Sequence, residues 1–108
     1  MTEQLLVAMF SEGIRDDLID ALIQLEEISG FSMQAIDGYS REHSQYDLRE
    51  QVAGYRRLCR VEILHDVEHE AALLAALEAV CGASPLRYWI TPLRSAGHLP
   101  AGEPATNT

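Results

Sequence analysis

Residues 55–80 read YRRLCRVEILHDVEHEAALLAALEAV, and two different periodicities follow one another within this stretch. Over Tyr55–His65, small apolar residues occupy every second position, which is the period of a β-strand. Ala71–Val80 is instead rich in alanine and leucine with the spacing of an amphipathic helix. Asp66 is suited to cap the start of this helix, and Gly82 to end it. The stretch therefore predicts a strand followed directly by a helix.

The same strand-then-helix pattern occurs earlier in the chain. Leu5–Phe10 is a short continuous apolar run, which predicts a strand buried on both faces. Ile14–Glu27 has helical spacing, and we expect Gly30 to end this helix in the left-handed conformation. Phe31–Ile36 alternates between apolar and polar residues, so we expect a half-buried strand. Leu86–Thr91 predicts a fourth strand.

Between the two halves, residues 39–54 are polar, and we interpret them as a long loop. The order β-α-β-loop-β-α-β predicts an α+β fold, the ferredoxin-like sandwich, with four antiparallel strands and two helices on one face. We expect one domain over residues 1–94 and a flexible tail over 95–108. Three apolar residues, Leu58, Leu64 and Trp89, are candidates for the face without helices, which we expect to become a subunit interface.

The composition excludes several classes of function. The chain has 108 residues and a net charge of -9, which argues against binding to nucleic acid or anionic lipid. All eight basic residues are arginines, so a P-loop lysine and a Schiff-base lysine are excluded. No signal peptide or membrane span is visible, so we expect a cytoplasmic protein without direct membrane insertion. No catalytic motif is present, and we expect a protein that is not an enzyme.

A basic island lies in the middle of this acidic chain. Residues 41–60 carry five of the eight arginines. Arg56 and Arg57 follow the expected loop, and arginine forks suit carboxylate or phosphate groups. We therefore predict a ligand site at the loop base, with candidate residues Gly38, Gln51, Arg56, Arg57 and Arg87. The alternative is that these arginines form salt bridges with acids of a neighbouring subunit.

A metal site is the second candidate. His43 with Glu42 could bind a transition metal such as Cu or Zn, because imidazole and carboxylate are suitable ligands. The alternative for His43 is a solvated side chain on a loop. His65 and His69 lie where the strand passes into the helix, and we expect both at the surface, in a capping role. The isolated Cys59 and Cys81 are expected to act as small hydrophobic residues in or beside buried elements.

Four strings, in this order and spacing, carry a resemblance to a known family. They are GFS at Gly30–Ser32, GYSREH at Gly38–His43, EQVAGYRR at Glu50–Arg57 and YWITPL at Tyr88–Leu93. The chain thereby resembles, over residues 4–98, an uncharacterised PII-like family of the nitrogen regulatory PII superfamily. Genes of that family often lie beside bacterial heavy-metal efflux pumps.

The resemblance implies a homotrimer with a ligand in the cleft between subunits. In this sequence the cleft would be built from residues 37–56, 81–86 and 92–98. The string CGASP at Cys81–Pro85 has one glycine and no cation, unlike the basic glycine-rich loop of nucleotide-binding PII proteins, so it argues against standard ATP binding. Tyr39 and Tyr46 are candidates for a modified loop tyrosine by location alone.

Together these features predict a cytoplasmic, trimeric regulatory protein. The long loop would change its order on binding a small ligand or metal ion and then contact a protein partner, a membrane metal-efflux transporter. The alternative is a metal-binding trimer for metal tolerance, similar to CutA proteins. A structural trimer without ligand is a third possibility.

Overall fold

The structure is a computed structural model that describes residues 2–39 and 56–101. Its elements in chain order are β1 (Glu3–Ser11), the 3-10 turn η1 (Glu12–Ile14), α1 (Arg15–Gln24), β2 (Phe31–Gly38), β3 (Arg56–Asp66), the 3-10 turn η3 (Val67–His69), α3 (Glu70–Cys81) and β4 (Leu86–Pro92). All four strands and both helices therefore lie within a few residues of the ranges expected from the sequence.

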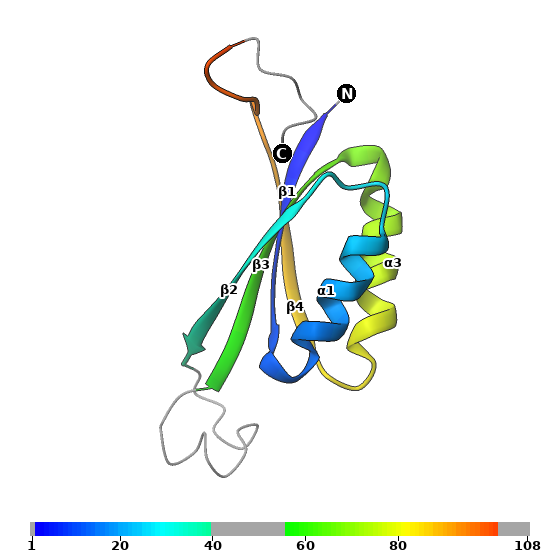
Figure 1. The fold of residues 1–108 in the computed structure, drawn as a ribbon, viewed down its shortest axis with the longest axis vertical. Helices are drawn as coiled ribbons and strands as arrows, with labels where there is room; N and C mark the ends of the chain where they lie inside the picture. Colours follow the sequence, from blue (N-terminus) through cyan, green and yellow to red (C-terminus); the bar gives the residue numbers. More distant parts are fainter. Residues whose placement is uncertain (1, 40–55, 102–108) are drawn as a thin grey trace.

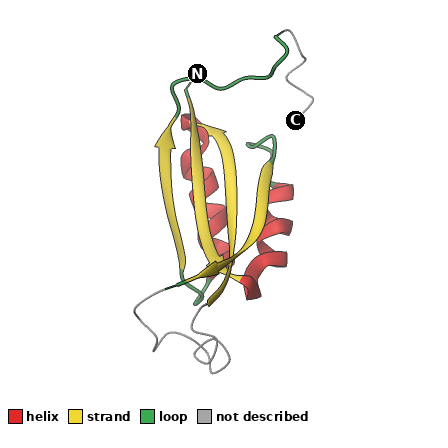
Figure 2. Ribbon diagram, turned by 90° about the vertical axis from the view of Figure 1, so that its left-hand side faces the viewer, coloured by secondary structure: helices red, strands yellow, loops and turns green. Residues whose placement is uncertain are grey.

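The four strands form one antiparallel sheet in the order β2-β3-β1-β4. At the centre of the sheet, Val7 of β1 lies between Glu62 of β3 and Trp89 of β4. Helices α1 and α3 lie on the same side of the sheet, so within residues 2–39 and 56–101 the other face carries no helix (Figures 1 and 2). For the described part of the chain, this confirms an α+β fold with a four-stranded antiparallel sheet and two helices.

The core lies between the sheet and the helices. Alternate residues of β1 and β3 point into it, and each helix contributes leucines one turn apart, Leu18 and Leu22 from α1 and Leu73 and Leu77 from α3. The fully enclosed aliphatic side chains contribute most of the driving force for folding, since burial of a leucine is favourable by about 1.5–3 kcal/mol. Phe10 is the largest fully buried side chain.

The first helix ends earlier than expected, and a 3-10 turn precedes it. The Oγ of Ser11 accepts a hydrogen bond from the backbone N–H of Gly13 at 3.3 Å, and this cap starts a 3-10 turn before α1. The helix ends at Gln24, because Leu25 is already extended and packs with Ile28 against the core. Gly30 therefore does not end the helix.

The end of α3 agrees with expectation. Gly82 follows the helix with φ 52° and ψ −119°, and it is the one described residue with positive φ. Asp66 also has its expected capping role, since its carboxylate accepts a hydrogen bond from the backbone N–H of Glu68 at 3.3 Å. The cap lies on η3, one turn before α3 begins.

The expectation that β1 is buried on both faces holds only in part. Leu5 and Met9 are half-buried, because their side chains point to the face without helices.

Among the described residues, no helix is both long enough and apolar enough to cross a lipid bilayer.

Candidate functional site

The paired ends of β2 and β3 bring three of the predicted ligand residues together. Gly38 lies opposite Arg56, and Asp37 lies opposite Arg57. The two strands stay paired up to the ends of segment 39–55, so these residues stand at its base (Figure 1). Arg57 is exposed there.

The three regions of the predicted cleft are divided between the two ends of the sheet. The turn before β4 lies at the same end as Gly38, since Leu86 pairs with Phe10 at the end of β1. The segment after β4 starts at the opposite end, where the backbone N–H of Leu93 bonds to the carbonyl of Glu3 at 3.2 Å. One chain therefore does not bring all three regions together, and a cleft containing them all requires a second copy.

Arg87 is separated from the other predicted ligand residues within one chain. It lies on β4 opposite Met9, which in turn lies opposite Arg60 of β3. With ~3.3 Å per residue and ~4.8 Å between strands, its Cα is roughly 16 Å from that of Arg56. The guanidinium of Arg87 lies over the ring of Trp89, 5.6 Å from its centroid. Such a cation–π contact orients both side chains on the surface.

Three further predicted residues, Glu42, His43 and Gln51, lie outside the described residues, as does Tyr46. The loop expected over 39–54 also falls almost entirely there. Tyr39 is described and exposed. In residues 2–39 and 56–101, no group of three or more His, Cys, Asp or Glu side chains could hold a metal ion.

The face without helices, here called the open face, has an apolar centre and charged surroundings. Leu58, Leu64 and Trp89 all point to it, as the alternation predicted. Leu64 and Trp89 are each 38% exposed, which is high for side chains of this size. Arg60 and Glu62 form an ion pair of 2.6 Å on the same face.

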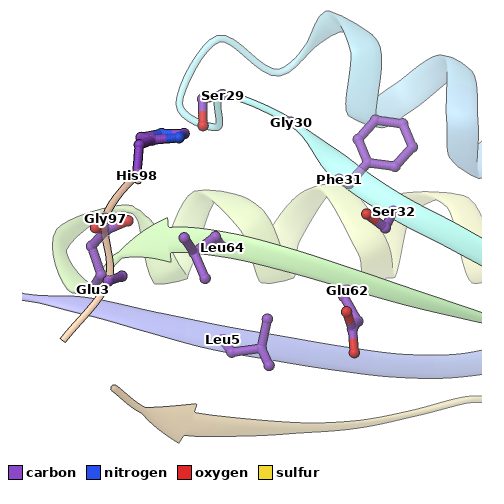
Figure 3. A pocket seen from close by; sticks show the side chains of 11 residues that line it. Glu3, Leu5, Ser29, Gly30, Phe31, Ser32, Glu62, Leu64, Gly97 and His98 are labelled. Carbon is purple, nitrogen blue, oxygen red and sulfur yellow. The ribbon is translucent and has the colours of Figure 1, made fainter. Parts of the chain in front are cut away.

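A groove of about 910 Å³ lies on the open face at the end where β1 begins. Leu5 and Leu64 line it from the sheet, and the carboxylates of Glu3 and Glu62 stand along it (Figure 3). Residues 96–98, which follow β4, close one side of the groove, with His98 on the side of Ser29 (Figure 3). The groove thus combines an apolar floor with an acidic margin.

On the opposite, helix-covered face, a buried hydrogen-bond network joins β1, β3 and α3. The Nδ1 of His65 lies 3.2 Å from the carbonyl oxygen of Ile63, which can only accept, so Nδ1 carries the proton. In the neutral ring, Nε2 then accepts from Nε2 of Gln4 at 3.0 Å. The same amide donates to Glu70 at 2.6 Å. Gln4 and His65 are 7% and 3% exposed.

The surface position expected for His65 was therefore wrong. His65 shares the strand parity of Cys59, Val61 and Ile63, which all face the core. This parity was the signal that could have placed it inside. It was missed because His65 lies at the end of the strand, where capping residues are also common.

The sequence matches one protein family over residues 1–100, and this family is described as "Protein of unknown function (DUF3240)". The chain belongs to this family. A DUF3240 family protein from Shewanella baltica OS155, known from a crystal structure, is 46% identical. The alignment covers 92% of this chain and 98% of that one, with a TM-score of 0.77. No protein with a curated description matches the sequence.

This DUF3240 protein has two free cysteines in different surroundings. Cys59 is buried in the core, and burial raises the pKa of its thiol above the ordinary value of 9.0, with smaller effects from Arg15, Glu12 and Asp16. Cys81 is half-buried at the end of α3, where its thiol donates to the carbonyl of Glu78 at 3.5 Å. Cys59 thus behaves as the small hydrophobic residue expected from the sequence.

Proposed function

We propose that this protein is a homotrimeric, non-enzymatic regulatory module of the PII-like kind, which acts in the cytoplasm. The element order and the sheet order β2-β3-β1-β4, with both helices on one face, support a ferredoxin-like sandwich. The open face supports assembly, because exposed apolar side chains such as Leu64 and Trp89 favour a subunit interface.

The proposed ligand is a small anion, held at the base of segment 39–55. The observation that carries this proposal is the register of β2 and β3, which sets Gly38 opposite Arg56 and Asp37 opposite Arg57. The guanidinium of Arg57, which is exposed at this strand end, suits a carboxylate or phosphate. Within one chain, the segment after β4 starts at the end of the sheet opposite this base. The site would therefore lie between subunits, with that segment supplied by a second copy.

Through segment 39–55, the protein would report ligand binding to a protein partner. The resemblance to the PII-like family suggests a membrane metal-efflux transporter as this partner. The turn at Cys81–Pro85 carries no cation. We therefore propose that the ligand is not ATP held in the standard PII mode.

Thermal unfolding with a panel of ligands tests the site. The panel contains ATP, ADP, AMP, cyclic nucleotides, Cu, Zn and Ag. An anion at a hundredfold excess over its Kd should stabilise the protein by about 2.7 kcal/mol. We expect this stabilisation to be lost in Arg57→Ala and kept in the matched control Arg15→Ala, since Arg15 lies on α1, outside the three regions of the proposed cleft.

Other outcomes separate the alternatives. Stabilisation by a metal that is lost in His43→Ala would instead support a CutA-like metal-binding trimer. Stabilisation by no member of the panel would contradict both ligand proposals. Light scattering tests the assembly, and a monomer at all concentrations would contradict a site between subunits.

A further inference from the structure

The two sides of the open face have opposite chemical character. On the β4 side, Arg87 and Trp89 form an exposed pair, with the guanidinium 5.6 Å from the ring centroid. Among the described residues, no carboxylate forms an ion pair with Arg87. This edge therefore presents a cation and a large apolar ring.

The other side presents the complement of that pair. The groove has the apolar side chains of Leu5 and Leu64 on its floor, between the carboxylates of Glu3 and Glu62 (Figure 3). Glu62 already pairs with Arg60 at 2.6 Å. Glu3 has no cationic partner in the described part of the chain, and it is exposed.

We propose that the groove receives the Arg87–Trp89 edge of a second copy of this chain. The indole of Trp89 would cover Leu5 and Leu64, and the guanidinium of Arg87 would reach Glu3. An aromatic ring seated in an apolar pocket, with an arginine at its margin, is a common composition for the centre of a protein interface. The inference rests on the homo-oligomeric assembly proposed above and names the side chains that would form it.

The positions of the two patches determine the symmetry of the contact. The Arg87–Trp89 pair lies at the β4 edge, whereas the groove extends from β1 across β3 to the start of β2. Each copy would therefore present its edge to one neighbour and its groove to another, a head-to-tail contact that forms a ring when the rotation between copies closes. A two-fold contact centred on β4 would instead bring two Arg87 side chains together.

This contact also gives Arg87 a role other than the ligand site predicted from the sequence. Within one chain, Arg87 lies two strands away from β3, which carries Arg56 and Arg57. In the proposed assembly, its charge serves the contact between copies.

Charge reversal tests the contact. The full chain is studied by light scattering over a dilution series, together with the emission of Trp89, the only tryptophan of the chain. Arg87→Glu and Glu3→Arg should each raise the concentration at which the assembly dissociates by tenfold or more. The double variant R87E/E3R should recover assembly, because the opposite charges face each other again. Arg15→Glu is the matched control and should behave as the wild type, because Arg15 lies on α1, on the other side of the sheet from the open face.

The emission of Trp89 provides a second readout. In the wild-type protein it should move to longer wavelength on dilution, because the ring leaves the groove and meets water. Far-UV circular dichroism of each variant identifies any loss of folding, and recovery in the double variant keeps the test valid if a single variant folds poorly.

Two results would overturn the inference in different ways. If the wild type assembles but R87E and E3R dissociate no more readily than R15E, this contact is wrong and the oligomer of the proposed function stands. A double variant that assembles no better than either single variant has the same meaning. If the wild type is a monomer at every concentration, both the contact and the assembly fail.

Discussion

Gln4 joins three elements through one amide group. Its Nε2 donates to His65 and to Glu70, so a single side chain links β1 to β3 and to the start of α3. Replacing it with leucine keeps most of the volume but leaves the buried Nε2 of His65 without a donor. Because an unsatisfied buried polar group costs about 1–3 kcal/mol, we expect Gln4→Leu to lower the free energy of unfolding by this amount.

Urea denaturation measures this effect. The matched control is Gln24→Leu, since Gln24 is exposed at the end of α1 and should change stability by less than about 0.5 kcal/mol. Equal midpoints for the two variants would show that the network contributes nothing to stability.

Because of the buried thiol of Cys59, we expect the free energy of unfolding to depend on pH in the alkaline range. Burial raises the pKa of its thiol in the folded state, so above pH 9 the unfolded thiol loses its proton while the folded thiol keeps it. The unfolded state then binds fewer protons, and the free energy of unfolding falls by at most about 1.4 kcal/mol per pH unit from this group. We expect Cys59→Ala to reduce the decline between pH 8.5 and 10.5.

The control for this experiment is Cys81→Ala, which removes the half-buried thiol at the end of α3. Its alkaline decline in stability should match that of the wild type. The comparison uses the slope with pH rather than the absolute stability, because Cys59→Ala also leaves a small cavity in the core. Parallel curves for all three proteins would contradict the assignment to Cys59.

At the scale of the elements, the end of α3 depends on one backbone conformation. Gly82 has φ 52° and ψ −119°, which residues with a Cβ rarely adopt, although a Cβ there would meet no atom within 4 Å. The cost of Gly82→Ala is therefore conformational, and we expect a loss of about 1–3 kcal/mol.

Gly13→Ala is the control for Gly82→Ala. A Cβ at Gly13 would lie 3.7 Å from the Oγ of Ser11, an ordinary contact, and its φ is not positive. This substitution should be neutral or should stabilise the protein by up to about 1 kcal/mol, because alanine restricts the unfolded chain. Thermal unfolding of both variants compares them directly, and a Gly82→Ala protein as stable as Gly13→Ala would show that the turn adapts.

At the scale of the whole molecule, the open face and the helical layer predict different effects on assembly. Leu64 is 38% exposed on the open face, and Ile23 is 69% exposed on α1. If copies meet through the open face, Leu64→Gln places an amide in an apolar contact. The dissociation constant should then rise about tenfold, which corresponds to about 1.4 kcal/mol.

Ile23→Gln makes the same chemical change on the other side of the molecule. It should leave the molar mass in light scattering as in the wild type, because the helical layer lies on the far side of the sheet (Figure 2). If the assembly dissociates in the Ile23→Gln variant but not in the Leu64→Gln variant, the copies meet through their helices, contrary to the proposal.

Much of the fold could be predicted from local periodicity. The alternation of Cys59, Val61 and Ile63 identified the core side of β3, and Gly82 marked the end of α3. The 3-10 turn before α1 was missed, because the cap from Ser11 to Gly13 does not alter the hydrophobic spacing. Of the predicted ligand residues, Gly38, Arg56 and Arg57 have neighbouring backbone positions. The reason is that β2 and β3 are consecutive strands that pair up to the ends of the segment between them.

The sequence by itself determined the approximate extents of the strands and helices and the inward side of β3, because side-chain periodicity is a local property of the chain. Only the tertiary structure decided which strands are neighbours and in what register. Arg87 and Arg56 are both strand arginines in the sequence, yet the order β2-β3-β1-β4 places β1 between their strands. The groove likewise depends on residues 96–98, which line it together with residues at the end of the sheet where β1 begins. Such pairings join residues distant in the chain, and no local pattern specifies them.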